Sequence, residues 1–201
     1  MITPMKYIDF NTWMTIIALT KSVMRTANIT QIINVPKEQI LPEYPRDLTK
    51  LKKPSIIIQK VADDISTPCF SNGFLGQAYD VASDTYYDVF GRRHFITLQY
   101  DVIADSNSEN AIIESILTDD VLCLGGKDIM IYDFVTSLTA PPILGTAKLK
   151  HDLDIIPIDA TENNNYRTTI RFYLEVLQAV IPPQEYVDLS KWIKISQRVK
   201  L

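Results

Sequence analysis

The sequence has little of the residue chemistry from which catalytic and metal sites are built. Its 201 residues include two cysteines and two histidines. Cys69 and Cys123 lack C-x-x-C spacing, and neither His94 nor His151 has a second ligand nearby at helical spacing. The glycine pair at 125–126 is not followed by the hydroxyl residue of a phosphate loop, and no Gly-x-Ser-x-Gly motif occurs. We therefore predict no catalytic, cofactor-binding or metal-binding residue, and expect that the protein is not an enzyme.

Long apolar runs and basic clusters are also scarce. No uninterrupted apolar stretch approaches the roughly 20 residues of a membrane-spanning helix, and the first ten residues lack a signal-peptide pattern. We expect synthesis in a reducing cytoplasm and no membrane partner. The net charge of −4 argues against general nucleic-acid binding. Lys50, Lys52 and Lys53 form the clearest basic cluster, which we interpret as the solvated flank of a strand.

Composition indicates one globular domain with an extension. Hydrophobic residues make up 46% and charged residues 22% of the chain, which are ordinary globular values. A chain of this size buries roughly 70% of its unfolded surface and needs no disulfide or metal to hold a core. We assign residues 1–183 to a single α+β assembly domain. Residues 184–201 are predicted to form a C-terminal helix or arm.

The stretch Arg92–Leu117 is predicted to be the structural spine. In its strand, Ile96, Leu98, Tyr100, Val102 and Ala104 alternate with Thr97, Gln99, Asp101 and Ile103. A period of two places one apolar face on a core and a mixed face outward. Ser106 and Glu109 then form a capping box, in which each side chain accepts a free backbone N–H at the start of a helix.

The remaining patterns complete an α+β fold. An N-terminal helix is predicted over Asp9–Asn28 and capped by Asp9 or Asn11, because a short side-chain oxygen there can accept a free N–H. Pro36–Pro54 is predicted to be an irregular connector. Strands are predicted at Ser55–Val61, Phe95–Ala104, Ile129–Val135, Lys148–Ile158 and Tyr166–Gln178. The last of these is expected to pair antiparallel with a neighbour in the same sheet as Phe95–Ala104. The predicted fold is thus a mostly antiparallel sheet packed by an N-terminal and a central helix, with long loops and a C-terminal extension.

An acidic, aromatic segment is the candidate interaction site. It follows the predicted long loop Ala62–Ser83, and its spacing does not match a calcium-binding loop. We predict a subunit or partner interface, with Arg92 and Arg93 in a charge pair with Asp84–Asp88 either within one subunit or between subunits. The candidate interface residues are Tyr79, Asp84, Tyr86, Tyr87, Asp88, Arg92 and Arg93, together with Trp192, Ile195 and Val199 in the C-terminal segment. The alternative is a small-molecule-binding α/β domain that uses residues 79–88.

The order of these segments resembles the tail terminator, or tail completion, proteins of long-tailed bacteriophages. The resemblance covers Phe10–Gln178 and rests on the N-terminal helix, the strand KPSIIIQ, the stretch GRRHFITLQYDVIADSN, the helix ENAIIESIL and the strand YRTTIRFYLEV. Related neck and head–tail connector proteins share a similar α/β pattern of elements and remain an alternative. Thr139–Asn165 and Gln184–Leu201 stand as additions to compact members.

The resemblance implies a virion structural protein located in the tail or neck and assembled in the host cytoplasm. Such proteins form a ring, expected to be a homohexamer, that caps the tail tube and, in contractile tails, the sheath. The implied partners are other copies of the chain, the tail tube protein, the sheath protein where the tail is contractile, and the head–tail connector. DNA is expected to pass through such a ring without specific binding, and no cofactor is implied.

Overall fold

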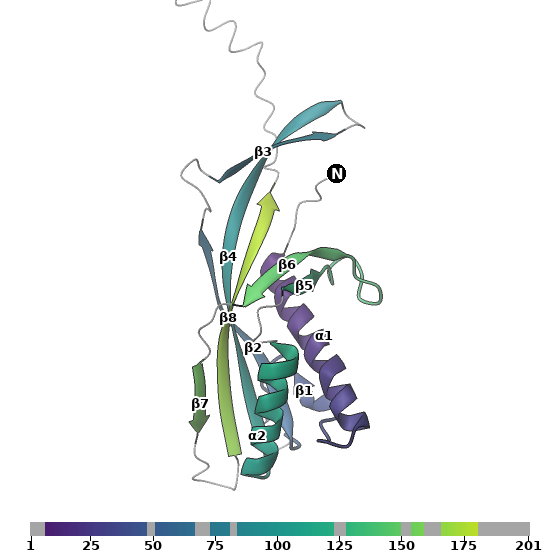
Figure 1. The fold of residues 1–201 in the computed structure, drawn as a ribbon, viewed down its shortest axis with the longest axis vertical. Coiled ribbons are helices and arrows are strands. Elements are labelled where there is room, and N and C mark those ends of the chain that lie inside the picture. The colour runs from purple at the N-terminus through teal and green to yellow at the C-terminus, as the bar shows by residue number, and fades with distance from the viewer. Residues whose placement is uncertain are drawn as a thin grey trace, which may run out of the picture.

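The computed structural model of the protein describes residues 7–47, 51–66, 73–80, 84–122, 128–149, 154–158 and 166–180. The chain has a mixed α+β fold in which α1 and α2 lie side by side on one face of a curled sheet (Figure 1). The helical elements are α1 (Ile8–Ile29), η1 (Lys37–Gln39), α2 (Asn107–Ile116) and η3 (Leu117–Val121). The strands are β1 (Ile40–Leu41), β2 (Ser55–Ser66), β3 (Phe74–Asp80), β4 (Thr85–Ala104), β5 (Ile129–Tyr132), β6 (Ile143–Leu149), β7 (Asp154–Ile158) and β8 (Tyr166–Val180). This confirms the predicted fold class.

The sheet has the order β1-β2-β4-β8-β6-β5, with β3 added to β4 and β7 added to β8. Only the short β1–β2 pair is parallel among the described strands. β4 and β8 pair antiparallel without interruption from Phe90 opposite Val180 to Ala104 opposite Tyr166. The prediction that β8 pairs antiparallel in the same sheet as β4 is therefore confirmed. The structure shows that one neighbour is β4 itself, and the two strands form the centre of the sheet.

The apolar face of β4 is the floor of the core, as its alternation predicts. Ile96, Leu98, Tyr100 and Val102 are fully buried there, beside the equally buried inner face of β8. The Tyr100 ring stacks on that of Phe172 with centroids 5.1 Å apart. Its hydroxyl lies 2.8 Å from the Thr20 hydroxyl of α1, so the one polar atom that this ring buries has a partner.

Helix α1 matches its predicted span but not its predicted cap. The residue before the helix is Tyr7, and no side chain caps the first turn. Asp9 pairs instead with Lys60 of β2, and Asn11 accepts the Phe134 N–H at 2.9 Å. The Asp9 or Asn11 cap was thus a wrong prediction, because Asp9 contacts β2 and Asn11 contacts the turn after β5, and the local pattern reveals neither contact.

Polar side chains account for part of the buried face of α1. Thr12 and Thr20 are buried and donate to the carbonyl four residues earlier, at 2.7 Å each. Thr15 accepts the Tyr132 N–H of β5 at 3.1 Å, and Trp13 donates to the Ile58 carbonyl of β2 at 2.8 Å. The last two bonds attach α1 to β5 at one edge of the sheet and to β2 toward the other edge.

No helix in the described chain is long and apolar enough to span a bilayer.

The turn into α2 has the predicted capping geometry. The Ser106 hydroxyl accepts the Glu109 N–H at 3.2 Å. The Glu109 carboxylate reaches back to the Asp105 N–H at 3.2 Å, one residue before the position in a standard capping box. Buried Ile113, Ile116 and Leu117 then place the helix and the following η3 on the core.

Several predicted boundaries were wrong. Ala62–Ser83 is not a long loop, because β2 continues to Ser66 and β3 occupies Phe74–Asp80. The strand predicted to begin at Phe95 begins ten positions earlier, at Thr85. The segment predicted as Lys148–Ile158 contributes to two strands, β6 and β7, and β5 ends at Tyr132. The Pro36–Pro54 connector holds only a short 3-10 turn and the two-residue β1 in its described part.

The outer face of β4 holds a buried carboxylate where a mixed solvent-facing side was predicted. Asp101 is fully buried and accepts bonds from Tyr44 (2.7 Å), Thr169 (2.5 Å), Gln99 (3.0 Å) and Arg167 (3.0 Å). Burial alone would raise the pKa of Asp101. The four hydrogen bonds stabilise the charged form more strongly, and the pKa is lowered overall. Tyr44 thereby ties the connector to the sheet.

We predict that Asp101→Asn lowers the free energy of unfolding by about 2–4 kcal/mol at neutral pH, because the Arg167 charge loses its partner. The folded-state pKa of Asp101 lies below its unfolded value of about 3.9, so this stabilisation is present above that pH and is lost as the pH falls through the folded pKa. Urea unfolding of the unaltered protein and of Asp101→Asn at pH 7 and near pH 3 checks this. The difference between their free energies of unfolding should be smaller at the acidic pH.

The control for this prediction is Asp105→Asn, since the Asp105 side chain is 69% exposed and pairs with Lys53 at 3.1 Å. An exposed pair contributes under about 1 kcal/mol. Equal effects of the two substitutions at pH 7 would contradict the assigned role of Asp101.

Candidate functional site

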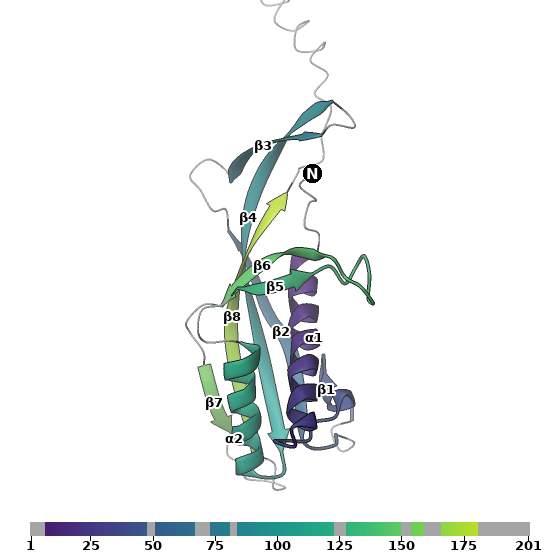
Figure 2. The same ribbon diagram turned by 45° about the vertical axis from the view of Figure 1, so that its right-hand side comes forward.

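Beyond the helices, β3 and the first part of β4 form a projecting two-stranded hairpin (Figures 1 and 2). We call residues 73–80 with 84–91 the arm. Its register pairs run from Phe74 opposite Phe90 to Asp80 opposite Thr85. A two-stranded hairpin is only marginally stable in water unless it packs on something else. The arm is therefore the described part of the fold that most needs a partner.

Gly73 permits two backbone segments of the chain to approach closely at the base of the arm. Its φ is +77°, and its carbonyl accepts the Gly91 N–H at 2.6 Å. A Cβ placed on Gly73 would lie 2.6 Å from the Gly91 carbonyl oxygen, a distance that real Cβ contacts do not reach. Glycine is thus required here both for its backbone conformation and for space.

Two aromatic pairs stabilise the arm from within. Phe74 and Phe90 meet edge to face with ring centroids 5.8 Å apart, and Tyr79 and Tyr86 meet at 4.9 Å. Each pair joins residues that lie opposite one another across the strands, where side chains contact most closely. Tyr86 is nonetheless 64% exposed and Tyr79 is 46% exposed. These rings leave much apolar surface in contact with water, as interface tyrosines do before binding.

The Asp84 and Asp88 carboxylates of the arm are exposed and form bonds with their neighbours. The Tyr79 hydroxyl donates to Asp84 at 2.5 Å, and the Gln77 amide donates to Asp88 at 2.9 Å. From Gly73 to Gly91 the sequence holds three aspartates and no lysine or arginine. The arm therefore presents negative charge and aromatic surface together. We call Tyr79, Asp84, Tyr86 and Asp88 the arm tip.

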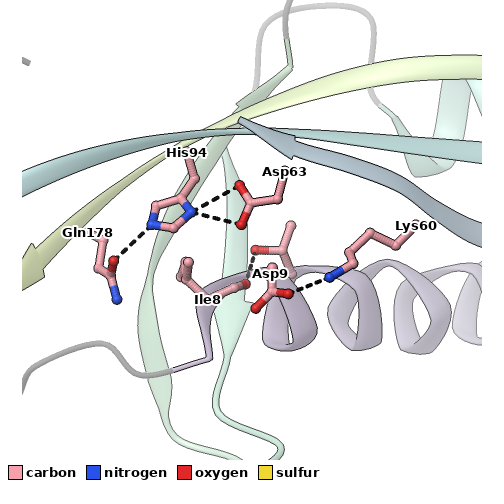
Figure 3. Close-up of polar contacts among 7 residues, drawn as sticks. Ile8, Asp9, Lys60, Asp63, His94 and Gln178 are labelled. Carbon is pink, nitrogen blue, oxygen red and sulfur yellow. Dashed lines mark hydrogen bonds and ion pairs between the residues drawn. The ribbon is translucent and has the colours of Figure 1, made fainter. Parts of the chain in front are cut away.

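A buried histidine joins three strands where the arm leaves the body (Figure 3). His94 is 5% exposed, and its Nδ1 lies 3.0 and 3.1 Å from the two carboxylate oxygens of Asp63 on β2. Its Nε2 lies 2.8 Å from the amide oxygen of Gln178 on β8. The ion pair between Lys60 of β2 and Asp9 of α1 lies beside this cluster. Together these contacts fix β2, β4 and β8 at the base of the arm.

A histidine paired with a carboxylate resembles a general-base arrangement, but its surroundings do not suit catalysis. His94 is enclosed, and its two ring nitrogens contact Asp63 and Gln178, neither of which is placed as a nucleophile. Within the described residues, no group of three His, Cys, Asp or Glu side chains could hold a metal ion. We interpret the cluster as structural.

A charge pair within or between subunits was predicted for Arg92 and Arg93 with Asp84–Asp88. Within the chain, Arg93 pairs instead with Glu175 of β8, with Nε and Oε1 2.8 Å apart, and Arg92 is exposed at the base of the arm. Both arginines lie at register positions opposite β8, while Asp84 and Asp88 lie farther along the arm. Sequence proximity did not indicate the Glu175 partner, and a pair between subunits stays a prediction.

The structure brings together the central part of the predicted site. Tyr79, Asp84, Tyr86, Tyr87 and Asp88 all lie on the arm. Trp192, Ile195 and Val199 lie outside the described residues, as do Cys69 and His151. Sequence reasoning missed the roles of Asp63 and Gln178, because residues 31 and 84 positions from His94 carry no local signal of the contact.

Three of the cavities in the described part of the body can be compared with the arm, and arm residues line none of these three. One of about 420 Å³ lies between α1, η3 and β5 and is lined mostly by apolar side chains, among them Leu19, Val121 and Ile129. A second of about 450 Å³ lies beside the connector. The third, of about 510 Å³, borders the C-terminal half of α1. The arm thus offers a protruding surface, which suits contact with a macromolecule better than enclosure of a small ligand.

In comparisons with known proteins, no protein-family model matches the chain and no curated protein gives a significant match.

We predict that Gly73→Ala loosens the arm without unfolding the body. The added methyl group meets the Gly91 carbonyl oxygen, so amide exchange in residues 74–80 and 85–90 should accelerate about tenfold or more, with the melting temperature nearly unchanged. Gly76→Ala is the matched control. Its φ of +136° is also unfavourable for alanine, but nothing lies within 4 Å of the added atom. Equal acceleration in both variants would contradict the close-approach argument.

Proposed function

We propose that the protein is a structural subunit that assembles with copies of itself through the arm. The observation that carries this proposal is the arm itself, a two-stranded hairpin with half-exposed tyrosines that projects beyond the helix layer (Figure 2). Tyrosine is enriched at the energetically important centres of protein interfaces, since it buries a large rigid ring and keeps a polar hydroxyl.

A second exposed apolar surface in the body supports assembly. The β5–β6 hairpin and its connecting residues carry large side chains that are more than half exposed. These are Met130, Val135, Leu138 and Ile143. Exposed apolar side chains that gather on one hairpin are typical of interaction surfaces. The chain therefore offers at least two separate surfaces for contact.

Within this class, we propose the role of a phage tail terminator or a close neck component. The order of helix, connector, central strand, capped helix and late strand supports this role through the resemblance described above. A sheet with helices on one face and a projecting arm is compatible with a ring subunit, whose neighbours meet through unlike surfaces. The proposed partners are other copies in a hexameric ring, the tail tube or sheath protein, and the head–tail connector.

The test of this proposal is the mass of the purified protein. Light scattering at micromolar concentrations should give a closed multiple of the 22.9 kDa chain, with six copies expected. A strict monomer across this range, with no ring formed on added tail tubes, would overturn the proposal.

We predict that Tyr86→Ser raises the dissociation constant of the assembly by about tenfold or more, because a largely exposed ring on the arm loses its contacts with the neighbouring copy. Tyr166→Ser is the matched control, since Tyr166 is 38% exposed and lies at the far end of β8 from the arm. Sedimentation of both variants over a concentration series checks the prediction. An unchanged constant for Tyr86→Ser, or the same loss for both, would count against assembly through the arm.

A further inference from the structure

A basic groove borders the C-terminal half of α1. Its volume is about 510 Å³, and its lining includes Lys21, Arg25 and Lys37 with Ala18 and Val35. Asn28 shapes it by bonding the backbone of Val35 twice, at 2.8 Å in each direction. Ser22 completes the lining, which contains no acidic residue. The groove therefore combines three cationic side chains with a small apolar floor.

The charge at this groove differs from that of the chain as a whole. The protein carries a net charge of −4, yet no aspartate or glutamate occurs from Phe10 to Lys37. Lys21 and Arg25 lie one helical turn apart, where like charges repel each other. Glu38 approaches Lys37 only to 3.9 Å, and both side chains are exposed. The groove thus remains electropositive and suits an acidic partner.

The arm tip has the complementary character. It carries aspartates without any basic residue, and its tyrosine rings can stack against lysine or arginine groups. Figures 1 and 2 both show the arm at one end of the molecule and the C-terminal part of α1 at the other. One copy cannot bring its own arm to its own groove across this separation.

We propose that the arm tip of one copy docks into the Lys21–Arg25–Lys37 groove of the next copy. This inference rests on the proposed self-assembly and names the two surfaces that meet. Opposite charges favour the encounter and its orientation, and the tyrosines add buried area at the centre of the contact. Because unlike surfaces at opposite ends meet, the contact is head to tail. It closes into a ring if the rotation between neighbours allows closure.

Charge reversal of each surface tests this contact. The groove variant carries Lys21→Glu, Arg25→Glu and Lys37→Glu, and the arm variant carries Asp84→Lys and Asp88→Lys. Each variant alone should bind itself about tenfold more weakly or worse, since like charges then face each other. An equimolar mixture should assemble again, because each arm then meets a groove of opposite sign. A matched control reverses Glu114, Asp119 and Asp120 around the end of α2, which lie outside both surfaces.

The outcomes separate the inference from the proposed function. If the unaltered chain is monomeric throughout, self-assembly itself fails. If it assembles and both reversed variants assemble equally well, only the docking contact fails. A mixture that stays monomeric although both variants melt like the unaltered chain also overturns the contact, as does binding of a small anion to the groove that leaves assembly unchanged.

Salt provides a second readout that needs no variant. The screening length falls from about 10 Å at 0.1 M to about 3 Å at 1 M salt, so added sodium chloride should dissociate the unaltered assembly. The groove variant and the arm variant, each alone, should instead associate better as salt rises. An assembly of the unaltered chain that strengthens steadily with salt would overturn the inference.

Discussion

The difference in rise per residue between an α-helix and a β-strand determines how much of the sheet the helices can cover. Helix α1 has 22 residues and spans about 33 Å at 1.5 Å per residue. Strand β4 has 20 residues and spans about 66 Å at 3.3 Å per residue. A helix layer of this length covers about half of the strand. The arm part of β4, from Thr85 to Gly91, lies in the remainder of the strand, so exposure of the arm follows from the lengths of the elements that the sequence encodes.

The body is complete without the arm. Two neighbouring residues of β4 make the contacts on its two faces. On the helix side, Tyr100 stacks on Phe172 and contacts Thr20 of α1. On the opposite side, Asp101 accepts hydrogen bonds from the connector and from β8. His94 then marks the last position at which β2, β4 and β8 are joined by buried polar contacts on the helix side. Beyond it, stability depends on cross-strand ring pairs and on whatever the arm contacts. This division between a self-sufficient body and a dependent arm is the physical basis for proposing assembly.

Alternation and capping predicted the centre of the fold correctly, because these signals are local. The apolar face of β4 from Ile96, the antiparallel place of β8 in the same sheet and the cap at Ser106 could all be predicted from neighbouring residues. The beginning of β4 was missed because Gly91, Arg92 and Arg93 interrupt the alternation. The burial of Asp101 and His94 depends on partners far away in the sequence. A period-two pattern could therefore predict the face of the strand on which each residue lies, but not whether the residue is buried. The arm residues were predicted by composition alone, and their arrangement on one hairpin required the structure.

Hydrogen exchange of the unaltered protein, measured below and above the concentration at which it assembles, tests the central claim most directly. Our account predicts that the amides of residues 74–80 and 85–90 exchange rapidly in the dilute protein and become protected about tenfold or more on assembly. Amides of the β4–β8 core around Tyr100 should be protected equally in both states. Arm amides that exchange at the same rate in both states would contradict the claim that the arm is the surface through which copies meet.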